Sequence, residues 1–419
     1  MIVELHNDFE SRSPVSPSDV GLHNYIFHPD TEPLFLWYNI NGAGYQCWRI
    51  WEYDEFKARD WENMPVPQDL DEALNDPKIM LVAFNSAFER YMLRKLGYEI
   101  PANRFIDPQV GGRYLSLPAS LEVQGTVLGL PAHLAKDKRG DDLITLFCEK
   151  VIVKATKKNP AREYYNDWTT HPREWEEFLN YGKQDVVAEG ELLRRMRILG
   201  ALPLPEFEQK LWLLDQLVND RGMPVDVEFV RKMYRLAVRA KEEAKKNFEI
   251  MTGVTNANSP TQIKKWAKTQ GYPYSTLKKD TVTSVLKDPE IKLTPTCRAA
   301  LKMRAEAAST SYQKLGKILE AVSPNGRLCG QFIFYGSSRC GRWSGNAVQL
   351  HNMARPMVVG EIKDDAGKVI RPGYDFEDQK VVMEARAMVY AEDYDGIKEK
   401  YLSVLLVVKS LIRTVFVAP

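Results

Sequence analysis

Short runs of β-branched and aromatic residues punctuate the first part of the chain. They cover residues 2–9, 34–40, 45–51 and 79–84, and each is bounded by Pro, Asn, Asp or Gly, which predicts four strands. Residues 41–44 separate the second run from the third and read Asn-Gly-Ala-Gly. Because a short glycine-containing loop between two apolar runs is typical of a hairpin, we expect a sheet that includes one β-hairpin.

The hydrophobic period changes after the fourth predicted strand. Apolar residues then recur at three- and four-residue steps, at Phe88, Met92, Leu93 and Leu96. This spacing predicts that the strand runs directly into a helix. A longer amphipathic helix is predicted over residues 175–198, and the segment 199–205, Leu-Gly-Ala-Leu-Pro-Leu-Pro, interrupts it. We place a domain boundary there.

Beyond this boundary the pattern is helical. The first predicted helix covers residues 206–218, with apolar residues at Phe207, Leu211, Leu214 and Val218. The second begins near Asp226, a residue type favoured at helix N-caps, and continues to about residue 251. Its apolar face is expected to carry Val230, Met233, Ala237, Ala240 and Ala244.

Composition and charge limit the function classes only loosely. The 419 residues suggest two or three domains of about 150 residues each. Lys and Arg number 57 against 56 Asp and Glu, so the net charge of +1 does not by itself indicate a nucleic-acid-binding protein. Any contact with nucleic acid must therefore be local.

The spacing of the cysteines and the length of the apolar runs indicate the cellular compartment that we expect for the protein. Five cysteines fall at no metal-ligand or redox spacing, which suits a reducing cytoplasm, and we expect them to be buried thiols. The first nine residues lack a basic region followed by an apolar core. The longest apolar run, residues 402–408, is far shorter than the ~20 residues that span a bilayer. We expect a cytoplasmic protein without a membrane anchor.

Two carboxylates end the first predicted strand. Asp8 and Glu10 are separated by one residue, so their side chains project from the same face and could share a metal ion. The spacing alone is weak support for a site. It recurs where solvated charge is the ordinary explanation, at Asp30, Asp60, Asp226, Asp288 and Asp375.

Two later segments supply matching groups. Residues 85–89, Asn-Ser-Ala-Phe-Glu, lie where the fourth strand enters its helix, and Glu89 alone could simply complement the helix N-terminus. Tyr181 and Asp185 are four residues apart and share one helix face, where a core tyrosine beside a surface aspartate is the simpler explanation. Asp107 begins another predicted helix, and we expect it to be an N-cap.

The ordered set of motifs resembles the DEDD exonucleases, in the version with tyrosine in the last motif, over residues 1–198. The resemblance implies an α/β exonuclease domain of the RNase H-like type. Glu89 stands where aspartate is most common, so its contact with metal could be direct or through a water. The implied metal-binding residues are Asp8, Glu10, Glu89 and Asp185, with Tyr181 orienting the attacking water and Asn85 and Phe88 against the nucleic acid.

The chemistry of phosphodiester hydrolysis independently calls for such residues. Two divalent cations activate water and stabilise the leaving oxygen, and Mg²⁺ prefers oxygen ligands. Crowded carboxylates without metal would repel one another, so we expect the site to depend on two Mg²⁺ ions, with Mn²⁺ as a substitute. The basic loop at residues 136–140 could contact phosphate, although a solvated turn is the simpler explanation.

A second resemblance covers the C-terminal part. Residues 338–345, Ser-Arg-Cys-Gly-Arg-Trp-Ser-Gly, and 349–352, Gln-Leu-His-Asn, look like the family A DNA polymerase segment T-G-R-x-S followed by N-L-Q-N. Cys340 replaces the usual threonine and His351 the usual glutamine. The resemblance implies contact with a primer-template duplex by Arg339, Arg342, Gln349 and Asn352.

The end of the chain extends this resemblance. Residues 412–419, I-R-T-V-F-V-A-P, resemble the stretch that leads to the first catalytic carboxylate of that family, so we expect that carboxylate beyond the last residue. Asp375 lies nine positions before Glu384, a spacing that differs from the D-x-x-x-x-E-x-R pattern of the family. Residues 377–394 instead predict an ordinary amphipathic helix. The chain itself should not polymerise DNA.

We therefore expect three parts: an exonuclease domain at residues 1–200, a helical thumb at 201–310, and the start of an α+β palm at 311–419. The expected function is 3′-to-5′ hydrolysis of single-stranded DNA ends, as the proofreading half of a phage or bacterial replication polymerase. One alternative is a non-catalytic DNA-binding module whose partial palm docks a separately encoded remainder of the polymerase. An inactive remnant is the other.

Overall fold

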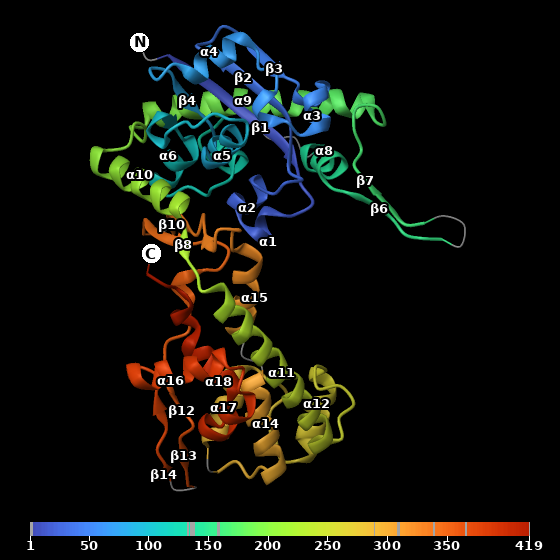
Figure 1. Cartoon of the computed structure of the whole chain (residues 1–419), viewed down its shortest axis with the longest axis vertical. Helices are drawn as coiled ribbons and strands as arrows, with labels where there is room; N and C mark the ends of the chain where they lie inside the picture. Colours follow the sequence, from blue (N-terminus) through green and yellow to red (C-terminus); the bar gives the residue numbers. More distant parts are fainter. Residues whose placement is uncertain are drawn as a thin grey trace. The chain divides into compact units, whose positions relative to one another are not determined.

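The structure is a computed structural model that describes residues 3–131, 134, 139–156, 160–288, 290–307, 311–337, 340–364 and 367–418. Its contacts divide the chain into two compact units. The first unit comprises Met1–Met223 and Arg327–His351, and the second comprises Pro224–Gly326 and Asn352–Pro419. Figure 1 draws both, coloured from the blue N-terminus to the red C-terminus.

The first unit is built around a mixed sheet. Its five strands lie in the order β3-β2-β1-β4-β5. They are β1 (Glu4–Arg12), β2 (Glu32–Ile40), β3 (Tyr45–Trp48), β4 (Met80–Val82) and β5 (Phe105–Ile106). β2 is antiparallel to β1 and to β3, whereas β4 is parallel to β1 and to β5. The predicted α/β class and the predicted hairpin, β2–β3, are both confirmed.

Helices surround this sheet. They are α1 (Pro17–Val20), α2 (Leu22–Ile26), α3 (Asp54–Ala58), α4 (Gln68–Asn75), α5 (Ala87–Lys95), α6 (Pro108–Tyr114), α7 (Leu121–Val127), α8 (Arg139–Cys148), α9 (Pro172–Ile198) and α10 (Glu206–Arg221). Short 3-10 turns occupy η1 (Ile50–Glu52), η2 (Trp61–Asn63) and η3 (Ala102–Arg104). Two small hairpins complete the unit: β6 (Val151–Val153) with β7 (Arg162–Tyr164), and β10 (Phe332–Ser337) with β11 (Arg342–Gly345).

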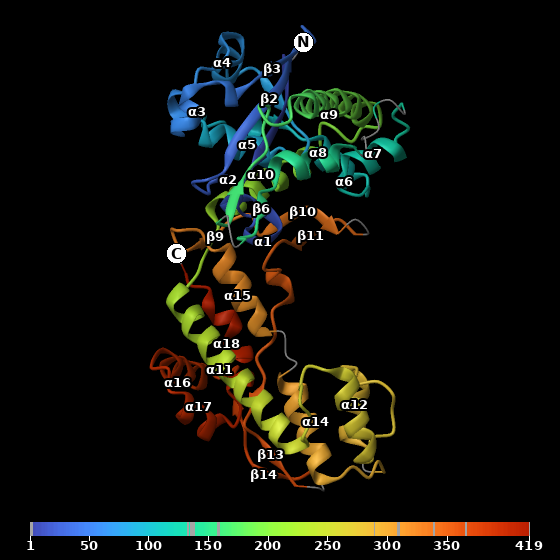
Figure 2. The same cartoon turned by 90° about the vertical axis from the view of Figure 1, so that its right-hand side faces the viewer.

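The long helix α9 packs along β1 and β2, and Figure 2 shows it beside the sheet from a second direction. Its apolar side chains Phe178, Leu192, Leu193 and Met196 are fully or almost fully buried, as the amphipathic pattern predicted. α5 packs against β1 and α2. The sequence pattern thus located the two helices that carry the candidate site.

The second unit is mainly helical. Its helices are α11 (Val227–Thr252), α12 (Pro260–Thr269), α13 (Lys279–Lys287), α14 (Pro295–Ala307), α15 (Ser311–Ala321), α16 (Gln379–Tyr390), α17 (Tyr394–Tyr401) and α18 (Val404–Leu411), with the turn η6 (Ile412–Val415). Two short antiparallel pairs join β12 (Val358–Val359) to β15 (Tyr374–Asp375) and β13 (Ile362–Lys363) to β14 (Val369–Arg371). α14, α15, α16 and α18 all pack on α11.

The remaining elements, β8 (Met223–Pro224), β9 (Arg327–Leu328) and η5 (Leu350–Asn352), lie where the chain passes between the units. The expected domain boundaries at residues 200 and 310 stay predictions. Asp226 caps α11 as predicted, because its carboxylate accepts a hydrogen bond from the Phe229 amide. No helix in the described parts of the chain combines the length and the apolar character needed to cross a bilayer.

The helix predicted over residues 206–218 is present as α10, whereas the expectation that the cysteines are buried thiols was wrong in part. The apolar pattern of α10 does not match its buried face, since Phe207 is 68% and Leu214 44% exposed. The buried positions carry Trp212, Asp215, Gln216 and Asn219 instead. Among the cysteines, only Cys297 and Cys329 are fully buried, and Cys340 is exposed.

Candidate functional site

β1 presents carboxylates on one of its two faces. Burial alternates along the strand, so that Leu5, Asn7 and Phe9 are buried while Asp8 and Glu10 are half-buried. β1 pairs with β4 only up to His6, so both carboxylates lie beyond that pairing. At these two positions β1 is paired with β2 alone among the strands of the sheet that the structure describes.

α9 supplies a third carboxylate to this place. Carboxylate oxygens of Asp8, Glu10 and Asp185 all lie within 4.8 Å of one another, and they form a candidate metal-binding group. A glycine permits the close approach of helix and sheet. A Cβ on Gly182 would lie 2.8 Å from Phe35 and 3.2 Å from Trp37 of β2, so no larger residue fits there without displacement.

Glu89 lies near this group without belonging to it. It is only 2% exposed, and its Oε2 has no hydrogen-bond partner among the described residues. Burial raises the pKa of Glu89 well above its usual value, and the charges of Glu189 and Asp107 act in the same direction. Hydrogen bonding to the Phe9 backbone partly offsets the rise. The carboxylate predicted for the second motif therefore lies against β1.

The cluster is electrostatically unfavourable as it stands. Burial raises the pKa of Asp8 well above its usual range, and the neighbouring charges of Asp185, Glu10 and Glu89 raise it further. A set of oxygen-only donors with this mutual repulsion matches what a hard divalent cation requires. The residues present thus fit Mg²⁺ or Mn²⁺.

Tyr181 lies one helical turn before Asp185 and is 9% exposed. Burial and the charges of Asp185, Glu10 and Asp8 raise the pKa of the Tyr181 hydroxyl, which therefore stays protonated at neutral pH. The ring stacks on Phe178 with centroids 6.3 Å apart. α8 also approaches the ring closely, since a Cβ on Gly140 would lie 2.3 Å from it.

The junction between β4 and α5 carries the predicted nucleic-acid contacts. Asn85 is exposed and has a left-handed backbone with φ of 67°. Phe88 is half-buried, with its ring centroid 6.3 Å from that of Tyr25. Asp107 is the N-cap of α6, as predicted, because its Oδ1 accepts a hydrogen bond from the Gln109 amide at 2.9 Å.

One buried residue near the site was missed in the sequence. Glu189, 2% exposed, lies one helical turn beyond Asp185. Its Oε1 is 3.2 Å from Nδ1 of His6, and its Oε2 accepts a hydrogen bond from the Phe84 amide at 2.7 Å. The i, i+4 spacing from Asp185 was the available signal, because residues four apart share a helix face.

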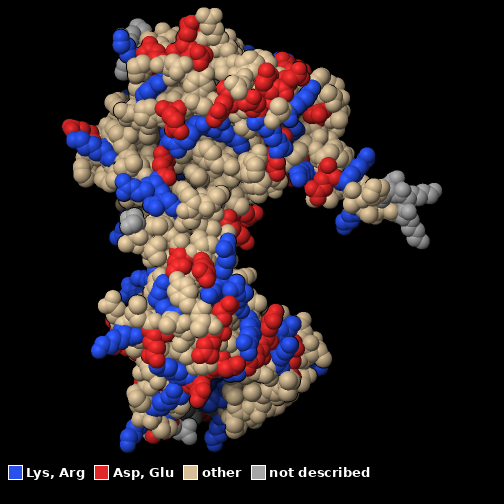
Figure 3. All heavy atoms as spheres, viewed as in Figure 1, with Lys and Arg blue, Asp and Glu red and all other residues tan. Residues whose placement is uncertain are grey.

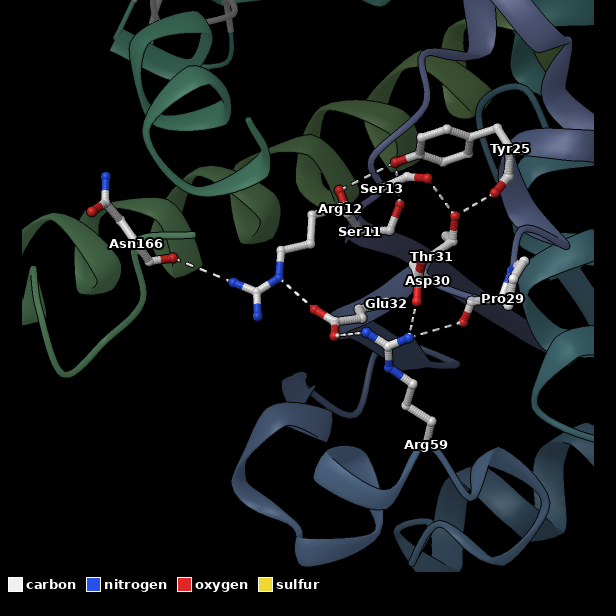
Figure 4. A network of polar contacts seen from close by, with 10 residues as sticks. All are labelled: Ser11, Arg12, Ser13, Tyr25, Pro29, Asp30, Thr31, Glu32, Arg59 and Asn166. Carbon is white, nitrogen blue, oxygen red and sulfur yellow. Dashed lines mark hydrogen bonds and ion pairs between the residues drawn. The ribbon is translucent and has the colours of Figure 1, made fainter. Parts of the chain in front are cut away.

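The end of β1 is fixed by polar contacts drawn in Figure 4. Arg12, two residues beyond Glu10, donates from Nε to Glu32 at 2.6 Å and from NH1 to the Asn166 carbonyl at 3.3 Å. Arg59 reaches the other oxygen of Glu32 at 3.2 Å and also pairs with Asp30. These ion pairs tie the end of β1 to β2 and to the end of α3.

A second group of contacts in Figure 4 lies beside the first. The Oγ of Ser11 is 3.0 Å from the hydroxyl of Tyr25, and Thr31 donates to Ser13 at 2.6 Å. Thr31 also bonds the Tyr25 carbonyl. Because Ser11 and Thr31 are buried, these bonds satisfy polar groups that water cannot reach.

The predicted duplex-binding residues lie elsewhere in the chain. Arg342 is exposed on β11, and Gln349 is exposed with φ of 52°. Asn352 is exposed in the second unit, and Arg339 lies outside the described residues. None of the three described residues joins the carboxylate group of Asp8. Their roles stay predictions.

The charges of the surface are mixed. Figure 3 shows lysine and arginine interspersed with aspartate and glutamate on the visible face of each unit, in keeping with the small net charge. In the loop at residues 136–140, positions 136–138 lie outside the described residues, and Arg139 pairs with Glu177 at 2.9 Å. That arginine is therefore already engaged.

Comparisons with known proteins give one strong match. The chain is 31% identical over 422 residues to the DNA polymerase of Bacillus phage SP02, an alignment that covers 99% of this chain and 57% of the phage protein. The chain thus spans little more than half the length of this relative. No protein-family model matches the chain.

Among solved structures, the POL domain of Pol1 from M. smegmatis, in complex with a DNA primer-template and dNTP, aligns with a TM-score of 0.46 and 14% identity. The alignment covers 87% of this chain and 53% of that one, and it is too weak to establish a shared fold. The sequence similarity to the phage protein extends over nearly the whole chain. The chain is accordingly homologous to part of a phage DNA polymerase.

Proposed function

We propose that the first unit is a 3′-to-5′ exonuclease that hydrolyses single-stranded DNA ends, and that it serves as the proofreading part of a DNA polymerase. The observation that carries the proposal is the group of Asp8, Glu10 and Asp185, whose carboxylate oxygens lie within 4.8 Å of one another. Homology to a phage DNA polymerase supplies the substrate class, because a nuclease attached to a polymerase acts on DNA.

Each site residue would have a defined part. Asp8, Glu10 and Asp185 would hold Mg²⁺, and the RNase H-like arrangement would place Glu89 close enough to contact it directly or through water. When bound, two such ions generate a nucleophile from water and stabilise the leaving oxygen. The protonated hydroxyl of Tyr181 would orient the water, since burial keeps its pKa above the usual value.

The DNA-binding residues complete the proposal. Phe88, half-buried beside the junction, could stack a terminal base, an interaction worth ~1–3 kcal/mol per base. Exposed Arg342 would bind phosphate, while Gln349 and Asn352 offer amides to sugar or groove edges. Such contacts are independent of sequence, which suits an enzyme that must act on any mispaired end.

The test is degradation of a 5′-labelled single-stranded oligonucleotide by the whole chain with Mg²⁺, with Mn²⁺ and with EDTA, alongside Asp8→Ala and Asp185→Ala. A metal-dependent ladder that shortens from the 3′ end, and that both variants lose, would support the exonuclease. Folded wild-type protein that binds the strand but never shortens it would refute the proposal.

A second candidate function is a non-catalytic assembly module. Apolar side chains lie exposed on the short strands of the second unit, at Val358, Ile362, Val369 and Ile370. Three of these residues lie on the paired strands β13 and β14, and apolar groups exposed together are typical of surfaces that bind another protein. Stable co-elution with a polypeptide made from the unmatched part of the phage relative, lost in Val358→Asp/Ile370→Asp, would favour this function.

A further inference from the structure

The backbone where β4 enters α5 lacks ordinary partners. Ala83 is the last residue bonded across the sheet, its amide donating to the Ile106 carbonyl at 3.2 Å. Regular helical bonds begin only with the amide of Arg90, which donates to the Ser86 carbonyl. The amides of Phe84, Asn85 and Ser86 fall between these two ladders. Buried amides left without an acceptor are strongly unfavourable, so each needs another partner.

Two carboxylates from different helices supply those partners. Glu189 of α9 accepts from the Phe84 amide at 2.7 Å. Asp107, at the N-cap of α6, accepts from the Asn85 amide at 3.1 Å through Oδ1 and from the Ser86 amide at 2.8 Å through Oδ2. Three successive amides of one junction are thus held by side chains that lie far apart in the sequence.

At Ser86 a long-range hydrogen bond to Asp107 takes the place of the usual helix N-cap. Ser86 occupies the N-cap position of α5, yet its side chain makes no capping bond. Its hydroxyl donates instead to Oδ2 of Asp107 at 2.9 Å. The ordinary local cap has given way to a long-range contact, which fixes the start of the helix relative to α6.

The conformation of the junction also requires support. Asn85 has φ of 67°, a left-handed conformation that costs roughly 1 kcal/mol or more outside glycine unless surrounding contacts enforce it. The bonds to Phe84 and Ser86 lie on either side of this residue. These hydrogen bonds fix the backbone on both sides of the left-handed residue Asn85.

Apart from these hydrogen bonds, the carboxylates of Glu189 and Asp107 are electrostatically unfavourable beside the site. Glu189 and Asp107 are 2% and 6% exposed, and burial raises the pKa of each. Both charges also act on Glu89. Placing buried carboxylates beside a cluster that already repels itself is costly, and the amide bonds they accept provide the compensation.

We propose that Glu189 and Asp107 are positioning residues, which fix the backbone of residues 84–86 and thereby set the place of Glu89 at the nuclease site. Glu89 lies in the first turn of α5, directly after the held amides, so its carboxylate follows any shift of the junction. His6 orients Glu189 through the contact at Nδ1. This inference rests on the proposed exonuclease function for its catalytic consequence, although not for the backbone contacts.

The test uses three variants and a matched control. Glu189→Ala removes the acceptor, whereas Glu189→Gln keeps one carbonyl oxygen for the Phe84 amide. Asp107→Asn retains a good N-cap for α6 but places an amide group opposite Ser86. The control is Glu191→Gln on the same helix, because among the described residues the hydrogen-bond donors to Glu191 are the side chains of Arg194 and Arg195.

The first readout is independent of activity. Hydrogen exchange of the backbone amides, measured by mass spectrometry on peptides covering residues 80–92 without metal or DNA, should be at least about fivefold faster at residues 84–86 in Glu189→Ala and Asp107→Asn. Exchange in the core of α9 should not change. The control should match the wild type throughout.

The second readout is cleavage of single-stranded DNA with Mg²⁺. We expect kcat to fall roughly 10- to 100-fold in Glu189→Ala, less in Glu189→Gln, and not in the control, with KM for the strand little changed. A purely structural role would lower stability without this graded effect on kcat. Protected amides in Glu189→Ala, or equal loss of kcat in Ala, Gln and control variants, would overturn the inference.

The two proposals fail in distinguishable ways. A wild-type chain that never cleaves DNA would refute the exonuclease, yet local loss of amide protection in the variants would still support the positioning contacts. Conversely, an active wild type with unchanged exchange at residues 84–86 in every variant would leave the exonuclease standing and remove the positioning role of Glu189 and Asp107.

Discussion

Carboxylate oxygens of Asp8 on β1 and Asp185 on α9 lie within 4.8 Å of each other. Burial and this proximity raise the pKa of Asp8, because the ionised form is poorly solvated and faces a like charge. The metal-free fold therefore contains an unfavourable contact at the place where we propose that metal binds. Removing one of these charges should therefore stabilise the metal-free protein and weaken metal binding.

Asp185→Asn should therefore be more stable than the wild type without metal but should gain less stability from Mg²⁺. In EDTA at pH 8 the variant should be more stable than the wild type by about 1 kcal/mol, because one repulsive charge is gone and one pKa unit corresponds to about 1.4 kcal/mol. Mg²⁺ should stabilise the wild type by binding the folded state, and the variant much less. Urea unfolding followed by tryptophan fluorescence measures both, since every tryptophan except Trp266 lies in the first unit.

Glu191→Gln serves as the control for that comparison, because Glu191 shares the helix but pairs with arginines at 2.8 and 3.0 Å. It should respond to Mg²⁺ as the wild type does. Equal stabilisation of the wild type and Asp185→Asn by Mg²⁺ would show that this carboxylate does not bind the metal.

A glycine sets the distance between α9 and the sheet. Gly182→Ala should destabilise the first unit by about 1–3 kcal/mol, since the new Cβ would meet the fully buried ring of Phe35 at 2.8 Å. We also expect reduced nuclease activity in protein that remains folded, because Tyr181 and Asp185 move with the helix. Denaturation and cleavage assays at low temperature check the two effects separately.

Gly190→Ala on the same helix is the matched comparison. A Cβ there would lie 3.6 Å from the nearest atom of His6, an ordinary contact. Because alanine is the better helix former, this variant should be more stable than the wild type by up to about 1 kcal/mol. Equal destabilisation by both substitutions would mean that helix flexibility, and not the approach to β2, explains the result.

The sequence predicted those parts of the site that depend on local periodicity. Asp8 and Glu10 follow from the two-residue period of a strand, and Tyr181 and Asp185 from the four-residue period of a helix. Glu189 fits the same helical spacing, but a glutamate on an amphipathic helix is ordinarily solvated. Its burial depends on the Phe84 amide, a partner that only the tertiary structure brings near.

The buried face of α10 was unpredictable for a similar reason. Asn219 is 8% exposed, and its side-chain amide both accepts from the Phe332 amide and donates to the Phe332 carbonyl, each at 2.9 Å. The Asn219 side chain thus satisfies the Phe332 backbone as a neighbouring β-strand would. An apolar pattern identifies a helix but cannot show which polar side chains will complete a distant backbone.

The pH dependence of stability should carry the signature of Asp215. Burial raises the pKa of Asp215 to about 7, and its Oδ1 has no hydrogen-bond partner among the described residues. Because the folded-state pKa exceeds the unfolded one, this group favours the folded state at low pH, and its contribution is lost as the pH rises from about 4 through 7. Asp215→Asn should remove that loss.

We therefore expect the stability of Asp215→Asn relative to the wild type to increase by roughly 2–3 kcal/mol between pH 5 and pH 8. Urea unfolding in EDTA at both values measures the difference, with Asp54→Asn as the control, because the Asp54 side chain is 96% exposed. A constant difference between wild type and variant across this range would contradict a buried, ionisable Asp215.

Tyr181→Phe separates the chemical role of the hydroxyl from the packing of the ring. The ring stacks on Phe178 and lies against Gly140, contacts that phenylalanine retains, so the unfolding free energy should change by less than about 1 kcal/mol. Cleavage should nevertheless slow roughly 10- to 100-fold if the hydroxyl orients the attacking water. The Mg²⁺ concentration at half-maximal rate should not change, because Tyr181 is outside the carboxylate group.

A variant that cleaves as fast as the wild type would exclude this role for the hydroxyl. A shifted Mg²⁺ dependence would instead mean that the Tyr181 hydroxyl positions the carboxylate of Asp185.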